Sequence, residues 1–495
     1  MNPEQKRAAE ALLRARVSRV PAAGELGRRF ARAGHELALV GGSVRDVFLG
    51  QMPGDGDLDL TTDATPEQVL ALVNGWADAV WTVGIAFGTV GLRKGGHTFE
   101  ITTYRSEAYS LKSRKPDVVY GSSLLEDLSR RDFTFNAMAA RLPDCEFVDP
   151  FGGLDALRAR ELRTPAAASV SFSDDPLRIL RAARFTAKLG LTVADDVRAA
   201  MTEQAPRLEI VSAERITVEL TKLMLTPDPA AGLDLLVQTQ VAEEVLPEIS
   251  RLRMEVDEHH RHKDVYQHSL TVLRQAIDLE PRYDLRGADG SGDLVVRLAA
   301  ILHDIGKPKT RTALPGGRVA FHHHEVVGAK MATRRLTTLR FPNDVVRDVA
   351  RLVELHLRFH GYGEGEWTDA AVRRYVRDAG PLLDRLHVLT RADCTTRNAR
   401  KAERLARAYD SLEQRIAELR EQETLDKLRP ELNGNEIMGI LGVPPGPVVG
   451  KAYDFLLELR INSGELGPER AAQELLRWAR EQGLQPHGPA GPPSG

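Results

Sequence analysis

The sequence predicts an α+β multidomain protein, in which a small mixed α/β head is followed by all-helical domains. Two observations support this fold class. Between residues 36 and 165, short apolar strands alternate with glycine turns and helices, whereas from about residue 166 apolar residues recur at helical spacing. The chain has 495 residues, which suits about three domains, and its hydrophobic content of 42% is enough for several cores.

Composition excludes several classes of protein. The net charge is −3, so a nucleic-acid surface would have to be a local basic patch rather than a global excess. The two cysteines, Cys145 and Cys394, are too few for a disulfide framework or a thiolate zinc site. The N-terminus lacks the apolar segment of a signal peptide, and no run of about 18 apolar residues occurs. We therefore expect a soluble cytoplasmic protein.

The first candidate site is a strand, a glycine turn and a helix near the start of the head. Residues 37–40 are apolar, Gly41 and Gly42 allow a tight turn, and residues 43–49 have the pattern of a helix. Free N–H groups and the dipole at such a helix N-terminus favour an anion such as a phosphate. Arg45, in the first turns of this helix, adds a positive charge for the same phosphates.

Acidic residues follow this turn. Asp57 and Asp59 are two residues apart, so on a strand their carboxylates share one face. Oxygen ligands beside phosphates favour Mg²⁺, and such a pair can hold two ions in a phosphoryl transfer. Residues 82–92 and 97–104 have the pattern of paired strands, and the second contains Glu100. Glu100 is either an edge-strand charge in water or a third catalytic carboxylate.

The order of strand, Gly-Gly, Arg and Asp-x-Asp resembles the head of polymerase-β-like nucleotidyltransferases. The pattern Val40-Gly41-Gly42-x-Val44-Arg45-Asp46 is similar to the class II CCA-adding tRNA nucleotidyltransferases and the related bacterial poly(A) polymerases. This resemblance implies Mg²⁺ on Asp57 and Asp59, a catalytic Glu100, and nucleotide binding by Gly41, Gly42 and Arg45. Residues 130–137, Arg-Arg-Asp-Phe-Thr-Phe-Asn-Ala, match a second family signature. It implies that Arg131 contacts the triphosphate and that Asn136 supports it.

A basic helix follows the head. Asp174 and Asp175 precede Pro176, a typical helix start, and the arginines recur at every third position as Arg178, Arg181 and Arg184. These arginines form either a solvated face or a ligand site. The resemblance implies that the Asp175–Arg178 pair selects the base, with Asp174 where the family usually has Glu, and that Arg181 and Arg184 orient nucleotide and primer.

The base-selecting chemistry follows from the two side chains themselves. A carboxylate only accepts hydrogen bonds and a guanidinium only donates them. Cytosine and adenine present an amino donor beside a ring acceptor, so Asp175 can accept from the amino group while Arg178 donates to the ring. Guanine and uracil present an oxygen where the amino group would be. One Asp–Arg pair therefore selects C and A against G and U.

The third region contains a set of histidines and aspartates. His303 and Asp304 follow the apolar run 298–302, and this set is similar in spacing to the ligands of the HD superfamily of phosphohydrolases. The resemblance implies a divalent transition metal held by His268, His303, Asp304 and Asp393, with His324 and His356 as added ligands of its two-metal subset. The alternative is an HD fold that has lost its metal. We interpret His259, His260, His322, His323 and His360 as ordinary exposed or core residues.

The sequence divides at positions where its pattern changes. The expected domains are an N-terminal helical segment 1–35, the head 36–165, a helical neck 166–255, an HD domain 256–400, a helical tail 401–484 and a disordered end 485–495. The resemblance implies addition of CCA to tRNA 3′ ends with CTP and ATP, with no membrane and no obligate protein partner. Alternatives are a poly(A) polymerase, an enzyme that adds only CC or only A, and an HD phosphohydrolase with an RNA-binding head.

Overall fold

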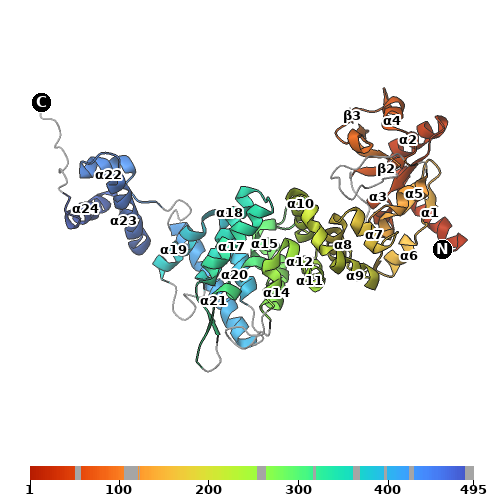
Figure 1. The fold of residues 1–495 in the computed structure, drawn as a ribbon. Helices are drawn as coiled ribbons and strands as arrows, with labels where there is room; N and C mark the ends of the chain where they lie inside the picture. Colours follow the sequence, from red (N-terminus) through yellow and green to blue (C-terminus); the bar gives the residue numbers. More distant parts are fainter. Residues whose placement is uncertain are drawn as a thin grey trace, which may run out of the picture. The chain divides into compact units, whose positions relative to one another are not determined.

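The computed structural model describes residues 1–50, 57–104, 121, 123–253, 264–315, 319–359, 368–394, 399–422 and 429–484 (Figure 1). The expected disordered end 485–495 lies outside these residues. The chain forms two compact units, Met1–Ser250 and Arg251–Gly495, here called unit 1 and unit 2. In the part of the chain that the structure describes, no helix is long and apolar enough to cross a membrane.

The head, in unit 1, is built around a seven-stranded mixed sheet with strand order β3-β4-β5-β2-β1-β6-β7. β1 is antiparallel to β2 and β6, and β2 is parallel to β5. The elements of the head are α1 (Pro3–Ser18), α2 (Pro21–Arg32), β1 (Leu37–Val40), α3 (Gly42–Phe48), β2 (Leu58–Thr62), α4 (Pro66–Val73), β3 (Ala79–Trp81), η1 (Ile85–Phe87), β4 (Thr89–Lys94), β5 (His97–Thr103), α5 (Leu124–Ser129), η2 (Thr134–Asn136), β6 (Ala139–Arg141), β7 (Glu146–Val148) and α6 (Gly153–Arg158).

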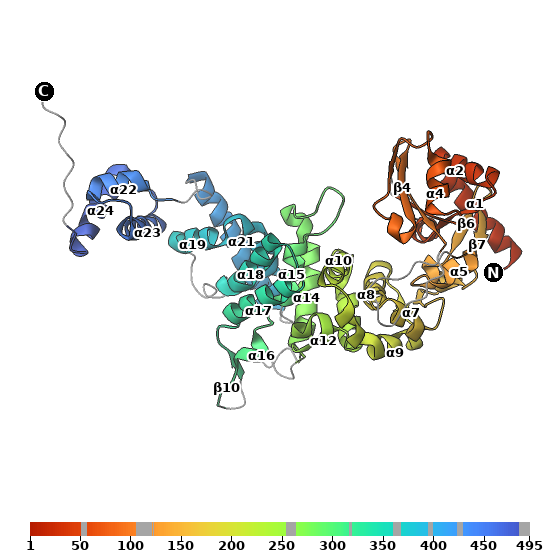
Figure 2. The ribbon, with the colours of Figure 1, turned by 45° about the horizontal axis from the view of Figure 1, so that its top comes forward.

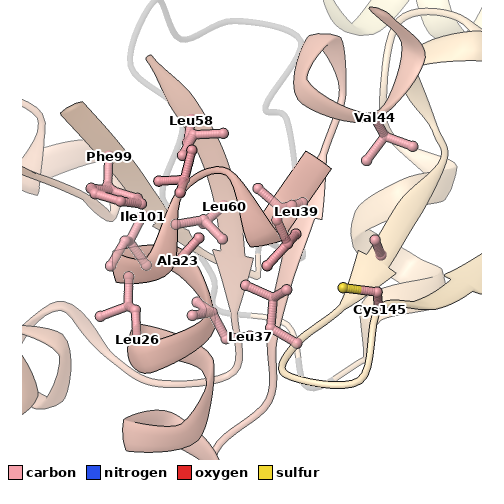
Figure 3. Packing of buried hydrophobic residues seen from close by; sticks show 14 of the residues in the cluster. Ala23, Leu26, Leu37, Leu39, Val44, Leu58, Leu60, Phe99, Ile101 and Cys145 are labelled. Atoms are coloured by element: carbon pink, nitrogen blue, oxygen red, sulfur yellow. The ribbon is translucent and has the colours of Figure 1, made fainter. Parts of the chain in front are cut away.

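One face of this sheet is covered by helices. Leu58, Leu60, Phe99 and Ile101 point into a core shared with α2, whose Leu26 lies against the strands (Figure 3). Figure 2 shows α2 and α4 beside the sheet, and residues of α1 belong to the same core. The N-terminal helices, which the sequence suggested as a separate segment, thus pack as part of the head.

The opposite face is only partly covered. Near β1 and β6 a second cluster joins Ala38, Val40 and Ala139 to Leu124 and Leu128 of α5. At β2 and β5 the same face carries the exposed side chains of Asp59 and Glu100. The candidate catalytic residues therefore lie where the second face is open.

The predicted hairpin is present but shorter than expected. β4 and β5 pair antiparallel, and Gly95 and Gly96 form the turn with φ of 59° and 84°. Residues 82–88, predicted as the start of a strand, instead contain η1, which ends at Gly88 in the left-handed region. The short edge strand β3 was not predicted.

The neck completes unit 1 and is mainly helical, as predicted. Its elements are β8 (Glu161–Leu162), α7 (Ala168–Asp174), α8 (Leu177–Leu189), β9 (Thr192–Val193), α9 (Asp195–Gln204), η3 (Ala205–Ile210), α10 (Ala213–Met224), α11 (Pro229–Gln238), α12 (Ala242–Val245) and α13 (Pro247–Ser250). The amphipathic helix α8 buries Ile179, Ala183 and Phe185 and packs against α10 and α11.

The described residues of unit 2 are helical apart from one small hairpin. Its elements are α14 (Val265–Leu279), η4 (Glu280–Tyr283), α15 (Leu294–Leu302), α16 (Lys307–Thr310), β10 (Arg311–Ala313), β11 (Val319–Phe321), α17 (His324–Thr338), α18 (Asn343–Leu355), η5 (His356–Arg358), α19 (Asp369–Ala379), η7 (Gly380–Leu382), α20 (Leu383–Asp393), α21 (Ala399–Gln422), α22 (Gly434–Leu441), α23 (Pro447–Ser463) and α24 (Pro468–Glu481). The last three helices form their own apolar cluster, which includes Ile437, Leu456 and Leu475.

Candidate functional site

The three candidate carboxylates of the head lie together. Asp59 on β2 is the direct register partner of Glu100 on β5, and Asp57 precedes Asp59 by two residues on the same face. Although the side chain of Asp59 reaches solvent, partial desolvation by the protein around it raises its pKa; Arg131 opposes this shift, and the charges of Glu100 and Asp57 add to it. Because these carboxylates repel one another, a divalent cation between them would be favoured. The donor set therefore fits Mg²⁺.

The glycine turn lies beside this strand. Gly41, between β1 and α3, has φ of +63°, and a Cβ there would lie 3.2 Å from Nη1 of Arg131. The Ser43 hydroxyl oxygen accepts the backbone N–H of Asp59 at 3.1 Å, which ties α3 to the carboxylate strand. Ser43 was predicted only as part of the helix 43–49, and its contact with Asp59, 16 residues away, was not predicted.

Arg131 retains unused hydrogen-bonding capacity at this turn. Its Nη2 donates to Asp127 at 3.2 Å, and its Nε is buried without a hydrogen-bond partner among the described residues. A buried guanidinium donor without an acceptor is costly, so an anionic ligand at the Gly41 turn would stabilise it.

Arg45 has a more internal position than its pattern suggested. Its side chain is buried, Nη1 donates to Asn136 at 2.7 Å and Nε donates to Asp46 at 2.7 Å. These bonds tie α3 to η2. Nη2 of Arg45 lies 3.5 Å from the position of a Cβ on Gly42, so the guanidinium is near the turn, and its contact with a phosphate stays a prediction.

Asp132 joins the head to the neck. Its carboxylate accepts from Nε of Arg181 at 2.8 Å and from the Asn136 amide at 2.9 Å. Burial alone would raise the pKa of Asp132, but Arg181 and the Asn136 amide outweigh it and lower the pKa below its ordinary value. Asn136, which also holds Arg45, therefore links the helix that follows the glycine turn to α8 through Asp132 and Arg181.

Arg181 and Arg184 have acidic partners that the sequence analysis did not identify. Arg184 donates from Nε to Glu219 of α10 at 2.7 Å, and Arg181 lies 3.8 Å from the same carboxylate. Glu219 is buried, so these charges hold α8 against α10. That both arginines orient nucleotide and primer remains a prediction, and in this structure they also stabilise the neck.

The Asp175–Arg178 pair is held by neighbouring residues. Asp175 accepts the backbone N–H of Leu177 at 3.2 Å and Nη2 of Arg215 at 3.2 Å. Arg178 donates to the Ser171 hydroxyl at 2.8 Å and to the backbone carbonyl of Arg130 at 2.6 Å. These bonds fix the orientation of both side chains. Arg215 is a contact that spacing along the chain could not show.

The six HD residues converge in unit 2. Two groups have ligand atoms close enough to hold a metal ion: His268, His303 and Asp393, and Asp304, His324 and His356. Asp304 faces both groups, since Oδ2 lies 3.2 Å from Nε2 of His303 and Oδ1 lies 3.3 Å from Nε2 of His324. The two groups, with Asp304 facing both, provide the donor set that could hold divalent metal ions.

Three of these imidazoles are oriented in the same way. The Nδ1 atoms of His303, His324 and His356 each lie 2.6–2.8 Å from the backbone carbonyl three residues earlier. With Nδ1 protonated, Nε2 offers its lone pair, and these three Nε2 atoms are buried without a hydrogen-bond partner among the described residues. Buried lone pairs that converge without donors are what a transition metal requires.

The side chains of this cluster shift one another's pKa values strongly. Burial would lower the pKa of His303, but Asp304 and Asp393 raise it to about 10. Burial lowers the pKa of His356 to about 3, and the charge of His303 adds to this shift. Lys307 also contacts Asp304, with 2.9 Å between Nζ and Oδ2. The buried carboxylate of Asp304 is thus close to cationic or protonated groups.

The remaining histidines have different environments. His322 and His323 are exposed, as interpreted from the sequence. His259, His260 and His360 lie outside the described residues.

Comparison with family models identifies three segments. Residues 37–163 match the "Poly A polymerase head domain", residues 190–252 match the "Probable RNA and SrmB- binding site of polymerase A", and residues 265–398 match the "HD domain". The first segment contains the three candidate carboxylates Asp57, Asp59 and Glu100, here called the carboxylate row. The second contains Arg215, and the third contains the six HD residues.

One relative is similar along most of the chain, and another along about half of it. An A-adding tRNA nucleotidyltransferase of Deinococcus radiodurans is 33% identical over 453 residues, which is 90% of this chain and 96% of that protein. A CCA-adding enzyme of Anoxybacillus flavithermus is 40% identical over 226 residues, 46% of this chain and 55% of that protein. The alignment with this CCA-adding enzyme therefore spans about half of each chain.

Solved structures have the same fold. The Bacillus stearothermophilus CCA-adding enzyme in complex with CTP is 26% identical, with a TM-score of 0.62 over 93% of this chain and 98% of that chain. The Thermotoga maritima CCA-adding enzyme complexed with tRNA is 17% identical, with a TM-score of 0.58 over 97% and 96% of the two chains. The second likeness concerns the fold alone.

Proposed function

The chain belongs to the family of tRNA nucleotidyltransferases, and from this premise we propose that it adds C and A to the 3′ ends of tRNA, using CTP and ATP. The observation that supports this most directly is the carboxylate row beside the glycine turn. Asp59 and Glu100 are register partners, and Ser43 bonds the Asp59 strand to the helix that follows Gly41.

We propose that Asp57, Asp59 and Glu100 hold Mg²⁺. When bound, Mg²⁺ would stabilise the attacking and leaving oxygens of nucleotidyl transfer. The Gly41-Gly42 turn and Arg131 would bind the triphosphate, and the unpartnered Nε of Arg131 supports this role. Arg45 lies behind the turn, bonded to Asn136, and would keep the turn in place while adding positive charge.

We propose that Asp175 and Arg178 select the base. Asp175 would accept from the amino group of cytosine or adenine, and Arg178 would donate to the ring acceptor. Each lost bidentate contact typically costs about 1–3 kcal/mol, which is enough to disfavour G and U. The bond that Asp175 accepts from Arg215 and the bond that Arg178 donates to Ser171 support this role, because they orient both groups in advance.

The relatives differ in the number of nucleotides that their names give: the D. radiodurans relative is named A-adding and the A. flavithermus relative is named CCA-adding. We propose addition of all three, with A addition alone as the second candidate. The test uses three tRNAs, lacking CCA, CA or A, each with CTP, ATP or both. Labelled C on the first tRNA together with labelled A on the third supports CCA addition. Labelled C on the first and second tRNAs with no A on the third indicates an enzyme that adds only CC, and A on the third tRNA alone supports an A-adding enzyme. No incorporation into any tRNA would refute both, and untemplated poly(A) tails would favour a poly(A) polymerase.

We further propose a metal-dependent phosphohydrolase activity in unit 2. Its support is the two ligand groups, the Asp304 carboxylate that faces both of them, and the three buried Nε2 atoms without a hydrogen-bond partner among the described residues. Imidazole-rich ligands favour transition metals such as Ni²⁺, Mn²⁺ or Co²⁺ over Mg²⁺. When bound, such ions would supply a nucleophilic hydroxide and a Lewis acid for phosphate ester hydrolysis.

We propose RNA ends with 2′,3′-cyclic phosphates as the substrate of this second site. Their hydrolysis would clear damaged ends before nucleotide addition. The test compares hydrolysis with each metal in the intact protein and in the double variant His303→Ala, Asp304→Ala. Hydrolysis without metal, or equal hydrolysis by both proteins, would refute the assignment. Nucleotide addition by the double variant should remain near that of the wild type, because the two sites share no residues.

A further inference from the structure

An indole lies on the catalytic face of the head sheet. Trp81 on β3 pairs with Gly91 on β4, and Gly91 pairs with Glu100 on β5. Glu100 in turn pairs with Asp59 on β2. Directly paired residues on neighbouring strands point to the same face. One row therefore leads across the sheet from the edge tryptophan to the catalytic carboxylates.

Glycine occupies the middle of this row because the indole ring takes the place of its side chain. A Cβ on Gly91 would lie 2.0 Å from Nε1 and 2.3 Å from Cε2 of Trp81, so the ring lies over the backbone of β4. With strands roughly 4.8 Å apart, the ring is roughly one strand spacing from Glu100 and two from Asp59. Trp81 is only half-buried, whereas Leu92 on the opposite face is fully buried.

A cationic side chain lies on the same face of the sheet as the ring. Arg93 follows Gly91 by two residues on β4, so it lies on the same face, and its side chain is exposed. It pairs with Ala79 on one side and Thr98 on the other. The open face thus presents an aromatic surface, a guanidinium and the carboxylates on four neighbouring strands, β3, β4, β5 and β2.

We propose that Trp81 and Arg93 bind the unpaired 3′ end of the RNA primer, with Trp81 stacked on the terminal base and Arg93 on a backbone phosphate. This inference rests on the proposed nucleotidyl transfer, in which the primer 3′ hydroxyl must reach Asp57 and Asp59. The terminal base changes with each addition, so its site must accept different bases. Stacking has this tolerance because every base has a π-face, whereas the Asp175–Arg178 pair discriminates among incoming nucleotides.

The competing explanation is that Trp81 only covers Gly91 and stabilises the edge of the sheet. Two substitutions separate these roles. Trp81→Phe keeps an aromatic ring, while Trp81→Leu keeps apolar cover without a π-face. Val80→Ala is the matched control, because Val80 is exposed on the same edge strand but points to the opposite face.

The measurements are KM for tRNA at saturating CTP, KM for CTP at saturating tRNA, and the unfolding midpoint. Trp81→Leu should raise KM for tRNA about tenfold, which corresponds to about 1.4 kcal/mol, and leave KM for CTP unchanged. Trp81→Phe and Val80→Ala should stay within about threefold of the wild type. Arg93→Ala should weaken tRNA binding and reduce the salt slope of log Kd by about one.

Equal tRNA KM values for the leucine and phenylalanine variants would overturn the inference and leave the role of cover. An equal rise in KM for CTP would overturn it as well. A fluorescence titration with a short single-stranded RNA separates this inference from the proposed function. RNA should quench the tryptophan fluorescence of the wild type more than that of Trp81→Phe, even if no nucleotide is added. Equal quenching would refute the stacking site. Absence of nucleotide addition would refute only the proposed nucleotidyl transfer.

Discussion

Asp132→Asn should destabilise unit 1 through the contact between head and neck. The carboxylate accepts from Arg181, from the Asn136 amide and from the backbone N–H of Phe133. An asparagine that kept the bonds to Asn136 and Phe133 would turn its own NH₂ group toward Arg181. Breaking a buried charge pair typically costs about 3–5 kcal/mol. Because 32% of the Arg181 side chain is exposed and water can replace part of the contact, we expect about 2–3 kcal/mol.

Urea unfolding of the intact protein measures this cost. Asp155→Asn is the control, because Asp155 pairs with Arg158 while both side chains are more than half exposed, and its loss should cost less than about 0.5 kcal/mol. The pKa of Asp132 is lowered in the fold, so its stabilisation is complete above the unfolded pKa near 3.9 and is lost as pH falls through the lower folded pKa. The difference between wild type and Asp132→Asn should therefore shrink in acid. Equal free energies of unfolding for Asp132→Asn and Asp155→Asn at pH 7 would refute the reasoning. A difference between wild type and Asp132→Asn that persists in acid would refute it as well.

Other substitutions test the two sites. Asp59→Asn should abolish incorporation of both C and A without unfolding the head, as measured by primer extension and circular dichroism; full activity would remove Asp59 from the catalytic set. Asp175→Ala should lower C and A incorporation by roughly 5- to 150-fold, from about 1–3 kcal/mol per contact, and relax discrimination against U and G. Arg215→Ala should also lower the ratio of C and A incorporation to U and G incorporation, but less, because Arg215 only positions Asp175. Arg215→Lys should restore part of this ratio, and an unchanged ratio in Arg215→Ala would contradict the positioning role. Protein purified without chelators should contain a transition metal that the His303→Ala, Asp304→Ala variant lacks, as measured by elemental analysis.

Local patterns were sufficient to predict much of the head. The strand, turn and helix at residues 37–49 appear as β1, Gly41 and α3, and the glycine pair at 95–96 appears as a hairpin turn. The prediction was wrong where local patterns were ambiguous: residues 82–88 resemble a strand, but glycines on both sides of η1 favour a turn. The packing of α1 and α2 into the head core depends on contacts far apart in the sequence, which periodicity does not encode.

The two sites differ in how much of their geometry is local. Three of the four HD imidazoles are oriented by a carbonyl three residues earlier, as in His303 with Ala300 and His324 with Phe321, so one turn of chain sets the direction of their Nε2 atoms. Residue type and spacing could therefore indicate the ligands, and only their convergence required the fold.

In the neck, by contrast, the acids that hold the arginines come from distant elements. Arg181 meets Asp132 across 49 residues of sequence, and Arg184 meets Glu219 across 35. A spacing of three predicts which arginines share a side of α8, but it cannot identify the anions that face them. An arginine stripe beside a nucleotide site can consequently bind ligand, hold its own helix, or do both. For Arg184, whose Nε donates to the buried Glu219, the structure favours a role in holding α8 in place.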